Sequence, residues 1–535
     1  MRISQAQLAL GGLLALWCAT LFFLSFGTQA VFLSPDENAV FVFARAYAQT
    51  GSFVLAEPLN ASVQFLLFPR SAIPAPQGLV PTTFLLFPAL LGTILKYFGT
   101  AAIYMVTPLL AVIAVFAIGD MTWRITRQRV TAVLAGFIAA VHPALWYYAA
   151  RPLMHNVAFA ALLVIGVWFG VRQPFSRVAI NAAFSGLTIG SALCIRPSEA
   201  PWIILSVFLF ACLSGLWRRL RLFDIAVFAA FSLLSLVALL GLQEVTYGNA
   251  FSFGYLQTTA VLTSSGVSSA EIITPSFVTK LFSLIFPFGI VVKAMVKHAV
   301  QYGFLLYPLF SALMVIGAIL FVQAPSDRRV RFAYVVTIAF ASLWLIALYG
   351  SWTFNDNPDP FVVTVGNSYV RYFLPLFLFS APLGAYAITS FAQRLKPYIP
   401  ESLVIGVVSL ALLVSGAMTV FGGDDGFLRS REVLAASAAK RAEIVRLTEP
   451  EAVVVVDRAD KFLFPYRRVV QPLRAETTYA AMPLIVSEVP LYYFGITLPQ
   501  QDIDYLNEVK LADLDLRIDE VQTIGDETLY QISSR

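Results

Sequence analysis

Two neighbouring carboxylates, Asp36 and Glu37, follow the first long apolar stretch of the sequence, directly after a proline. Carboxylates at the edge of a low-dielectric region are costly to keep there unless they are used or paired. In such a place a carboxylate can serve as a general base or bind a cation. The pair is therefore the first candidate for chemistry in this chain.

The same residues also fit the start of a helix. Ser34 suits an N-cap, and Asp36 and Glu37 follow in the first turn, where acidic side chains complement the helix dipole. Ser34 and Glu37 have the spacing of a capping box. The helix is predicted to end at about Thr50, before Gly51. Capping and catalysis are compatible, because Glu37 can close the box while Asp36 faces a substrate, so both interpretations stay open.

The composition indicates a membrane protein. Of the residues, 59% are hydrophobic and 13% are charged, with a mean hydropathy of +0.77, whereas soluble domains are about half apolar and about a quarter charged. The net charge of +5 comes from basic residues in short loops between apolar runs, which indicates topology and excludes a nucleic-acid partner. Three cysteines, Cys18, Cys194 and Cys212, lie in apolar runs and lack the spacing of a metal site or disulfide framework.

Apolar runs of about 20 residues predict a polytopic helical protein with about 11 transmembrane helices. The predicted spans are 6–33, 101–123, 131–150, 153–171, 178–195, 199–217, 223–243, 303–323, 331–350, 370–391 and 402–421. If the N-terminus is cytoplasmic, every basic cluster between these spans faces the cytoplasm, as the positive-inside rule requires. The clusters are Arg124/Arg127/Arg129, Arg172/Arg177, Arg218/Arg219/Arg221, Arg328/Arg329/Arg331 and Arg394/Lys396.

The run at 81–99 is interpreted differently, as an interfacial or re-entrant helix on the outer face. It is only marginally long enough to span, and counting it as a span would place all five downstream basic clusters outside. This topology leaves three sizeable outer segments, at 34–100, 244–302 and 351–369.

Beyond residue 421 the composition becomes charged. A helical stretch there is followed by a β-run at 452–456, which predicts a small soluble α/β domain. We therefore expect a transmembrane domain over 1–421, whose first outer loop, 34–100, carries juxtamembrane helices, and an outer-face domain over 422–535.

This plan resembles the GT-C superfamily of integral-membrane glycosyltransferases, which includes the lipid A aminoarabinose transferases and the protein O-mannosyltransferases. The most specific feature is an acidic PDE directly after the first span, and RYFLP in the predicted tenth span is the second. Further matching stretches are AVFVFARAYAQTGSF, HPALWYYAARPLMHN, CIRPSEAP and NSYVRYFLPLF. The similarity concerns the order of spans, loops and domains along the chain more than the identity of individual amino acids.

The resemblance implies an inverting transfer of a sugar from a polyprenyl-phosphate carrier to an acceptor on the outer face of the membrane. Such a transfer needs a carboxylate to take the acceptor proton and cations to hold the departing lipid phosphate. The resemblance makes Asp36 the candidate base, with Glu37 as its alternative.

Arg371, at the outer end of the predicted tenth span, is the main candidate ligand of the donor phosphate, and Arg151, His155 and Lys293 on the outer face are further candidates. Each has an alternative that stays open: Arg371 as an interfacial arginine, Arg151 and His155, one helical turn apart, as solvated loop residues, and Lys293 as a contact to anionic head groups. In an enzyme, Asp36, Arg371 and the Arg151/His155 turn should line one cavity.

Several points stay open. The acceptor is a protein, a glycolipid or a polymer. No cofactor is specified, and the participation of a divalent cation stays open. The predicted location is the cell (inner) membrane, with several spans and the C-terminal domain on the extracytoplasmic side. The rival function is a transporter or flippase of lipid-linked sugars. Transporters usually carry charged residues near the middle of their spans, whereas here the charges gather at span ends.

Overall fold

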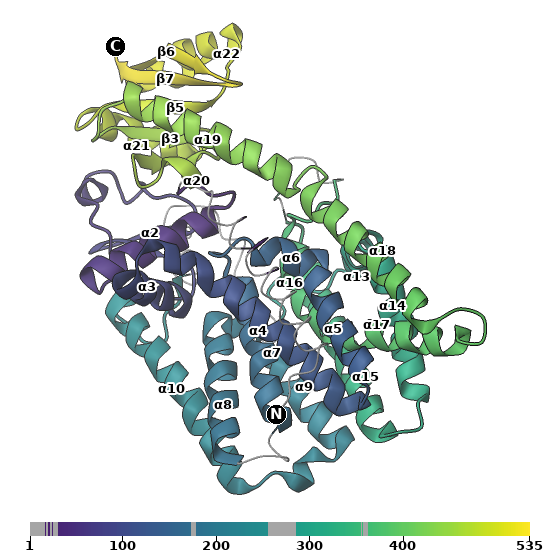
Figure 1. Cartoon of the computed structure of the whole chain (residues 1–535). Helices are drawn as coiled ribbons and strands as arrows, with labels where there is room; N and C mark the ends of the chain where they lie inside the picture. The colour runs from purple at the N-terminus through teal and green to yellow at the C-terminus, as the bar shows by residue number, and fades with distance from the viewer. Residues whose placement is uncertain are drawn as a thin grey trace. The chain divides into compact units, whose positions relative to one another are not determined.

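Figure 1 shows the computed structural model of the chain, which is mostly helical. It describes residues 17, 20, 21, 24, 30–172, 178–254, 285–354, 356 and 362–535. By their contacts the residues fall into two compact units. The first comprises Met1–Phe26, Tyr104–Ala238 and Ile272–Arg429, and the second comprises Gly27–Ile103, Leu239–Glu271 and Ser430–Arg535. The domain boundary expected after residue 421 stays a prediction; by contacts, the first outer loop groups with the C-terminal residues.

The first unit is a bundle of apolar helices. In chain order its α-helices within the described residues are α4 (Thr100–Thr126), α5 (Arg129–Val141), α6 (Pro143–Ala149), α7 (His155–Arg172), α8 (Val178–Ile195), α9 (Ala200–Ser214), α10 (Leu222–Tyr247), α13 (Val292–Val300), α14 (Pro308–Gln323), α15 (Arg328–Gly350), α16 (Ser368–Tyr372), α17 (Leu374–Leu395) and α18 (Glu401–Phe421). Short helical turns cover Pro197–Glu199, Leu216–Arg219 and Gln301–Leu305. The last part of α10 belongs to the second unit.

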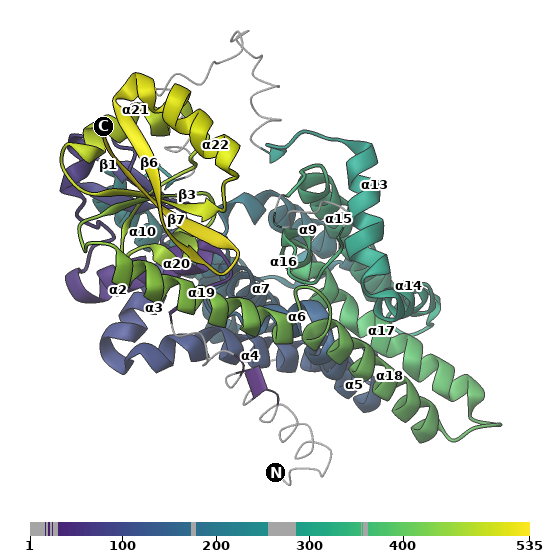
Figure 2. The same cartoon turned by 90° about the horizontal axis from the view of Figure 1, so that it is seen from above.

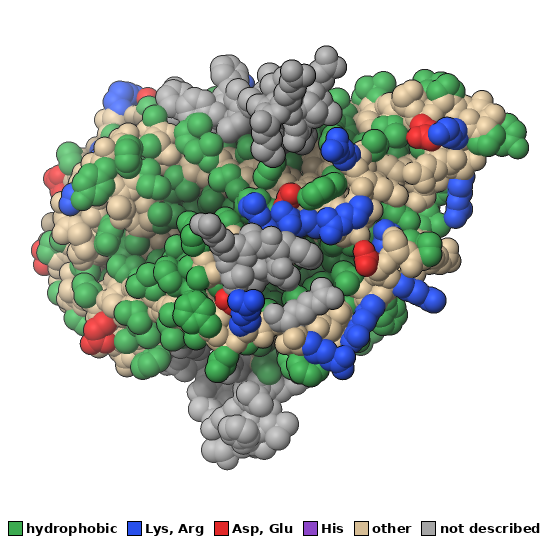
Figure 3. All heavy atoms as spheres, turned by 60° about the horizontal axis from the view of Figure 1, so that its bottom comes forward, with side chains coloured by type: hydrophobic (Ala, Val, Ile, Leu, Met, Phe, Trp, Pro, Cys, Tyr) green, Lys and Arg blue, Asp and Glu red, His purple; other side chains and the backbone are tan. Residues whose placement is uncertain are grey.

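Seven helices in the described part of the chain are long and apolar enough to cross a membrane, and the number rises to nine if each of two bent pairs is one span. This confirms a polytopic helical membrane protein. Of the predicted spans, 178–195 is the shorter helix α8, and most of 6–33 lies outside the described residues. Figure 3 shows one face of the molecule, where hydrophobic side chains cover much of the surface and Lys and Arg side chains gather among them.

Two predicted spans are bent at prolines. The pair α5 and α6 bends by 57°, and the pair formed by Val292–Leu305 and α14 bends by 99°. Helix α6 begins at Pro143 and α14 at Pro308. Proline lacks the backbone N–H that would continue the preceding helix, so each span ends and restarts there.

Glycine allows close helix packing in this bundle. A Cβ atom at Gly317 of α14 would lie 1.9 Å from the backbone oxygen of Leu383 in α17, and one at Gly186 of α8 would lie 2.2 Å from that of Phe228 in α10. Membrane helices lack a strong hydrophobic drive to associate and pack through such small residues.

The second unit begins with helix α2 (Pro35–Thr50), followed by a short turn (Pro58–Ala61), strands β1 (Ala72–Ala75) and β2 (Gly78–Pro81), and helix α3 (Leu86–Phe98). The two strands form an antiparallel hairpin. Helix α3 packs on α2, where a Cβ atom at Gly92 would lie 2.7 Å from the oxygen of Ala44. The run predicted at 81–99 is therefore a helix only from Leu86, and Pro81 ends a strand instead.

The C-terminal residues form a five-stranded mixed sheet in the order β4-β3-β5-β7-β6. Its elements are α19 (Phe427–Leu447), β3 (Val453–Val456), α20 (Asp460–Leu463), β4 (Arg468–Val470), α21 (Glu476–Val486), β5 (Leu491–Ile496), α22 (Gln500–Tyr505), β6 (Leu516–Ile524) and β7 (Glu527–Ser534). Strand β3 is parallel to β4 and β5, and the other pairs are antiparallel. Helices α19 and α21 lie on opposite sides of the sheet (Figure 2). The predicted order of helix and β-run is confirmed.

The first outer loop contributes to the core of this sheet. Val63 and Leu67 are buried with Val453, Val455 and Tyr493 in one hydrophobic cluster. Arg468 at the start of β4 also binds the Glu57 carboxylate at 2.8 Å. Residues 57–67 and the C-terminal sheet thus share one folded unit.

Candidate functional site

The acid pair stands at the start of α2, as the sequence predicts. Ser34 is the N-cap, with φ −122° and ψ 143°, and its Oγ accepts a hydrogen bond from the backbone N–H of Asp36 at 3.2 Å. The helix ends at Thr50, and Gly51 takes the left-handed conformation with φ 75°. Both predicted helix boundaries are confirmed.

The Asp36 carboxylate is bound by a side chain from the same outer loop. Ser71 donates its hydroxyl to Oδ1 of Asp36 at 2.6 Å. The neighbouring Arg70 holds Asp460 in α20, with Nη2 2.6 Å from Oδ1 and the backbone N–H 2.9 Å from Oδ2. These two contacts place Asp36, Ser71 and the C-terminal helix α20 side by side in the second unit.

Other C-terminal residues surround the start of α2. The side-chain amide of Asn38 donates to the backbone oxygen of Phe464 at 3.0 Å, and Lys461 donates to that of Leu33 at 3.4 Å. Arg441 in α19 donates to the oxygen of Ala30 at 3.1 Å. Glu37 is buried, with 5% of its surface exposed. Residues 30–38 are therefore a contact region for α19, α20 and the residue after α20, as well as the start of a helix.

The first unit places Arg371 in the short helix α16. Asn367 caps this helix through its side chain, which accepts the N–H of Tyr369 at 3.2 Å. The Arg371 guanidinium donates to Ser368 Oγ at 2.8 Å and to Met154 Sδ at 3.3 Å, and it lies 5.3 Å from the centre of the Tyr372 ring. Contact with Met154 joins α16 to the turn between α6 and α7.

Two further predicted residues lie in that turn. Arg151 is buried and lies over the rings of Tyr147 and Tyr148, at 5.7 and 5.6 Å. His155 is the first residue of α7. The two are therefore not one turn apart on a single helix, because Arg151 precedes α7. The structure brings the segment that contains both of them next to Arg371.

Lys293 is exposed near the start of α13, and no hydrogen bond or ion pair joins it to another described residue. The same helix contacts α16 through a different residue, because His298 stacks on Tyr369 with ring centres 4.3 Å apart. Its Nδ1 lies 2.8 Å from the oxygen of Gly350. His298 therefore reaches the Arg371 helix, whereas Lys293 lies on the open surface.

Asp36 and Arg371 belong to different units. Their expected meeting in one cavity stays a prediction, as do the roles of all six candidate residues. Sequence reasoning missed Ser71 and Asp460. No local motif marks these two residues, because each acts through a partner elsewhere in the chain. In the first unit, the carboxylate of Asp356 accepts the N–H of Ser368 at 2.7 Å.

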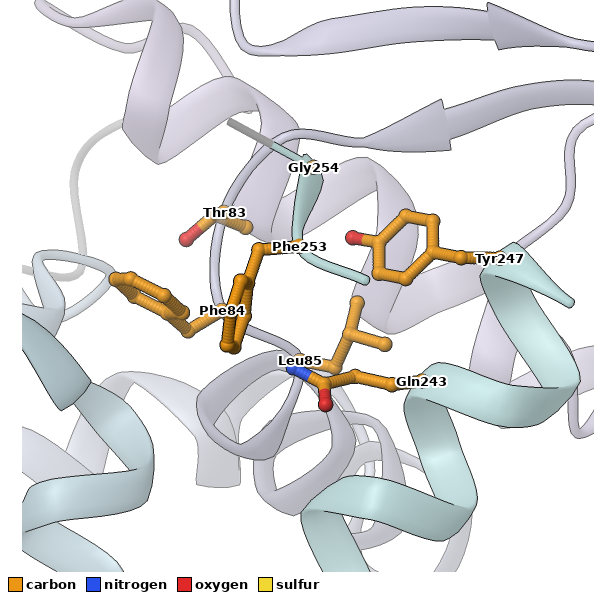
Figure 4. Close-up of a pocket in the computed structure, with 7 residues that line it drawn as sticks. All are labelled: Thr83, Phe84, Leu85, Gln243, Tyr247, Phe253 and Gly254. Carbon is orange, nitrogen blue, oxygen red and sulfur yellow. The ribbon is translucent and has the colours of Figure 1, made fainter. Parts of the chain in front are cut away.

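Two other features add no site. Arg196 and Glu199, three residues apart, form a buried ion pair at 2.8 Å and neutralise each other. A hollow shown in Figure 4 leaves no room for a water molecule and is lined by Thr83, Phe84, Leu85, Gln243, Tyr247, Phe253 and Gly254. Within the described ranges, no group of three or more His, Cys, Asp or Glu side chains could hold a metal ion.

The fold is similar to solved structures over nearly the whole chain. A crystal structure of ArnT, a lipid A aminoarabinose transferase, from Cupriavidus metallidurans bound to undecaprenyl phosphate matches with a TM-score of 0.59 and 13% identity, covering 97% of this chain and 98% of that one. The apo structure of the same protein matches with a TM-score of 0.56 and 12% identity, covering 98% of each chain. No family model and no curated protein sequence matches. This chain therefore has the fold of these ArnT structures over nearly its whole length, in agreement with the fold that the resemblance implies.

Proposed function

We propose that the protein is an inverting glycosyltransferase that moves a sugar from a polyprenyl-phosphate donor to an acceptor on the outer face of the cell membrane. The observation that carries this proposal is the likeness of the whole fold to a transferase solved with undecaprenyl phosphate. The C-terminal residues 422–535 then lie on the extracytoplasmic side, and the acceptor is a protein, a glycolipid or a polymer.

Asp36 serves as the general base in this reaction. The acceptor hydroxyl oxygen attacks the anomeric carbon, the bond from that carbon to the phosphate oxygen breaks, and the lipid phosphate leaves with the bonding electrons. The acceptor proton passes to the Asp36 carboxylate. The 2.6 Å hydrogen bond from Ser71 supports this role, because it fixes one carboxylate oxygen while the helix is capped by Ser34. Glu37, which is buried, is the alternative base.

The departing phosphate needs positive charge close by. Arg371, with Arg151 and His155 in the adjoining turn, supplies a compact cationic group for it, and an arginine fork suits phosphate geometry. Lys293 is the fourth candidate and, being exposed, can approach the phosphate only from the surface.

The distribution of charge favours this function over a transporter. In the described spans, charged side chains lie within the first or last two turns, for example Asp120 and Arg124 in α4, Asp224 and Glu244 in α10, and Arg331 in α15. Transport of polar solutes usually requires charge near the membrane midplane.

An assay of Asp36→Asn tests the proposal. The purified chain is incubated with a panel of undecaprenyl-phosphate-linked hexoses and pentoses and with an acceptor extract that contains membrane proteins, glycolipids and polymers, and released undecaprenyl phosphate is measured. Wild type should turn over one donor, and Asp36→Asn should lower kcat about 100- to 10,000-fold, the range for a general base. The exposed Asp513→Asn is the matched control and should leave kcat unchanged. Full activity in Asp36→Asn would remove the proposed base and direct the test to Glu37→Gln, and a wild type without any transfer would contradict the function.

A further inference from the structure

We infer that Ser71 is a positioning residue for the Asp36 carboxylate, and that the C-terminal helix α20 fixes the positions of both residues. This inference rests on the proposed function of Asp36. It gives the C-terminal residues a role in catalysis, although the chemistry of the transfer does not by itself require them.

The contact between the two side chains is direct. Ser71 Oγ lies 2.6 Å from Asp36 Oδ1, and the two residues are 35 positions apart in the sequence. A short hydrogen bond to a charged acceptor restricts the carboxylate to one orientation. A general base acts only within hydrogen-bond reach of its proton, so its orientation sets the rate.

The backbone of Ser71 is held in an uncommon conformation. Its φ of 65° is in the left-handed region, which serine rarely adopts. The oxygen of Ser71 accepts the N–H of Thr82 at 3.1 Å, which ties the residue to the β1–β2 hairpin. Strained backbone persists only where the surroundings enforce it, and such residues cluster at functional sites.

On the other side of Ser71, Arg70 is fixed to α20. Its backbone N–H, Nε and Nη2 all donate to the carboxylate of Asp460, at 2.9, 3.1 and 2.6 Å. Asp460 is completely buried. The Nη2 of Arg70 also donates to the backbone oxygen of Arg458 at 3.2 Å. Residue 70 therefore cannot rotate without breaking several bonds to the C-terminal segment.

The same segment also holds α2. Asn38, two residues after Asp36, donates to the oxygen of Phe464, the residue that follows α20. The base and its hydroxyl partner are thus both tied to residues 460–464, one through Asn38 and the other through Arg70. Anchoring two partners to one rigid element is how a site is preorganised.

Three variants at one position separate positioning from a purely structural role. Ser71→Ala and Ser71→Gly both remove the hydroxyl, but glycine tolerates the positive φ and alanine does not. Ser71→Thr keeps a hydroxyl, but its β-branched side chain is strained at this φ. Among the three variants, unfolding temperatures should therefore rank glycine first, then alanine, and threonine last.

Activity should rank in a different order. With the release assay above, kcat per folded molecule should fall about 10- to 100-fold in both Ser71→Ala and Ser71→Gly, with KM within about twofold of wild type, and should be retained in Ser71→Thr. A purely structural role predicts that kcat follows stability, so that Ser71→Gly is the most active variant. That result, or full activity in both Ser71→Ala and Ser71→Gly, would overturn the inference.

The Asp36→Asn result distinguishes failure of the positioning inference from failure of the proposed base. If Asp36→Asn is inactive while both hydroxyl-free variants keep wild-type kcat, Asp36 is the base and Ser71 does not position it. If Asp36→Asn is fully active, the proposed base is wrong and the positioning role is excluded with it.

Discussion

Replacing Arg70 by alanine should destabilise the protein more than replacing its partner, Asp460, although both changes break the same ion pair. The asymmetry follows from exposure, because the Arg70 side chain is 37% exposed and that of Asp460 is 0% exposed. Arg70→Ala leaves a deeply placed carboxylate without its cationic partner, whereas Asp460→Ala leaves a guanidinium that already contacts water.

The magnitudes follow from these environments. Removing one partner of a fully buried pair costs about 3–5 kcal/mol of unfolding free energy. Water can enter the space that the partly exposed arginine leaves, so we expect about 3 kcal/mol for Arg70→Ala, at the lower end of that range. In Asp460→Ala the guanidinium keeps its bond to Arg458 and gains water, which leaves a cost of about 1.5 kcal/mol for the lost charged hydrogen bonds.

Thermal unfolding of the purified full chain measures these differences. For a folded unit of this size, 1 kcal/mol corresponds to about 2–4 °C, so Tm should fall by about 6–12 °C in Arg70→Ala and by about 3–6 °C in Asp460→Ala. The double variant should resemble Asp460→Ala more than Arg70→Ala, because the second change removes the stranded carboxylate. Amide exchange in residues 57–71 should accelerate in the same order.

The exposed pair Arg517–Asp519 is the matched control. These side chains are 58% and 55% exposed and 3.1 Å apart, so Arg517→Ala should change the unfolding free energy by no more than about 0.5 kcal/mol. Equal Tm losses in Arg70→Ala and Asp460→Ala, or full additivity in the double variant, would refute the argument from burial.

Two other predictions test separate parts of the molecule. Arg371→Ala should weaken binding of undecaprenyl phosphate about 10- to 100-fold, which is the contribution of a charged hydrogen bond, as measured by titration in nanodiscs. Replacing the exposed Arg328 by alanine is the control and should change this affinity less than about twofold. Equal losses of affinity in the two variants would remove Arg371 from the donor site. Lys440→Gln should lower unfolding free energy by about 0.5–1 kcal/mol at neutral pH. Burial alone would lower the Lys440 pKa, but hydrogen bonds to Asp526 and Glu527 raise it, and the bond from Lys440 lowers the pKa of Asp526. The raised pKa of Lys440 contributes stability that is present below the ordinary lysine pKa of 10.5 and is lost as pH rises through the pKa of the folded protein. The lowered pKa of Asp526 contributes stability that is lost as pH falls below the ordinary aspartate pKa of 3.8. The stability difference between wild type and Lys440→Gln should therefore be flat between about pH 5 and 10 and shrink outside that window, and a difference that varies across pH 5–10 would contradict the assignment.

Local signals predicted the elements that depend on local physics. The cap at Ser34 and the glycine at 51 define α2 because helix ends are set by side chains within one turn. The spans were visible from apolar length, and the bends at Pro143 and Pro308 could have been expected from proline chemistry. The β1–β2 hairpin was missed, because its four-residue strands lie beside a much stronger helical pattern.

Most of the candidate site depends on contacts that no local pattern encodes. Arg70 and Asp460 are 390 positions apart, and Asn38 and Phe464 are 426 apart. The sequence shows an isolated arginine in a loop and an aspartate in DRAD, and neither suggests the other. Val63 and Leu67 were likewise unremarkable in the outer loop, yet they complete the core of the C-terminal sheet. Tertiary pairing at this separation becomes visible only in the folded chain.

The start of α2 shows how capping and catalysis can share a motif without competing. Ser34 satisfies the N–H of Asp36 with its own oxygen, so the helix start does not depend on the Asp36 carboxylate. That carboxylate instead accepts the hydroxyl of Ser71. Because Asp36→Asn keeps the cap, Pro35 and the backbone N–H, a loss of activity in this variant can be attributed to the missing carboxylate charge and not to unwinding of α2. The two interpretations of the acid pair thus become separable, since one concerns the backbone N–H of residue 36 and the other its side chain.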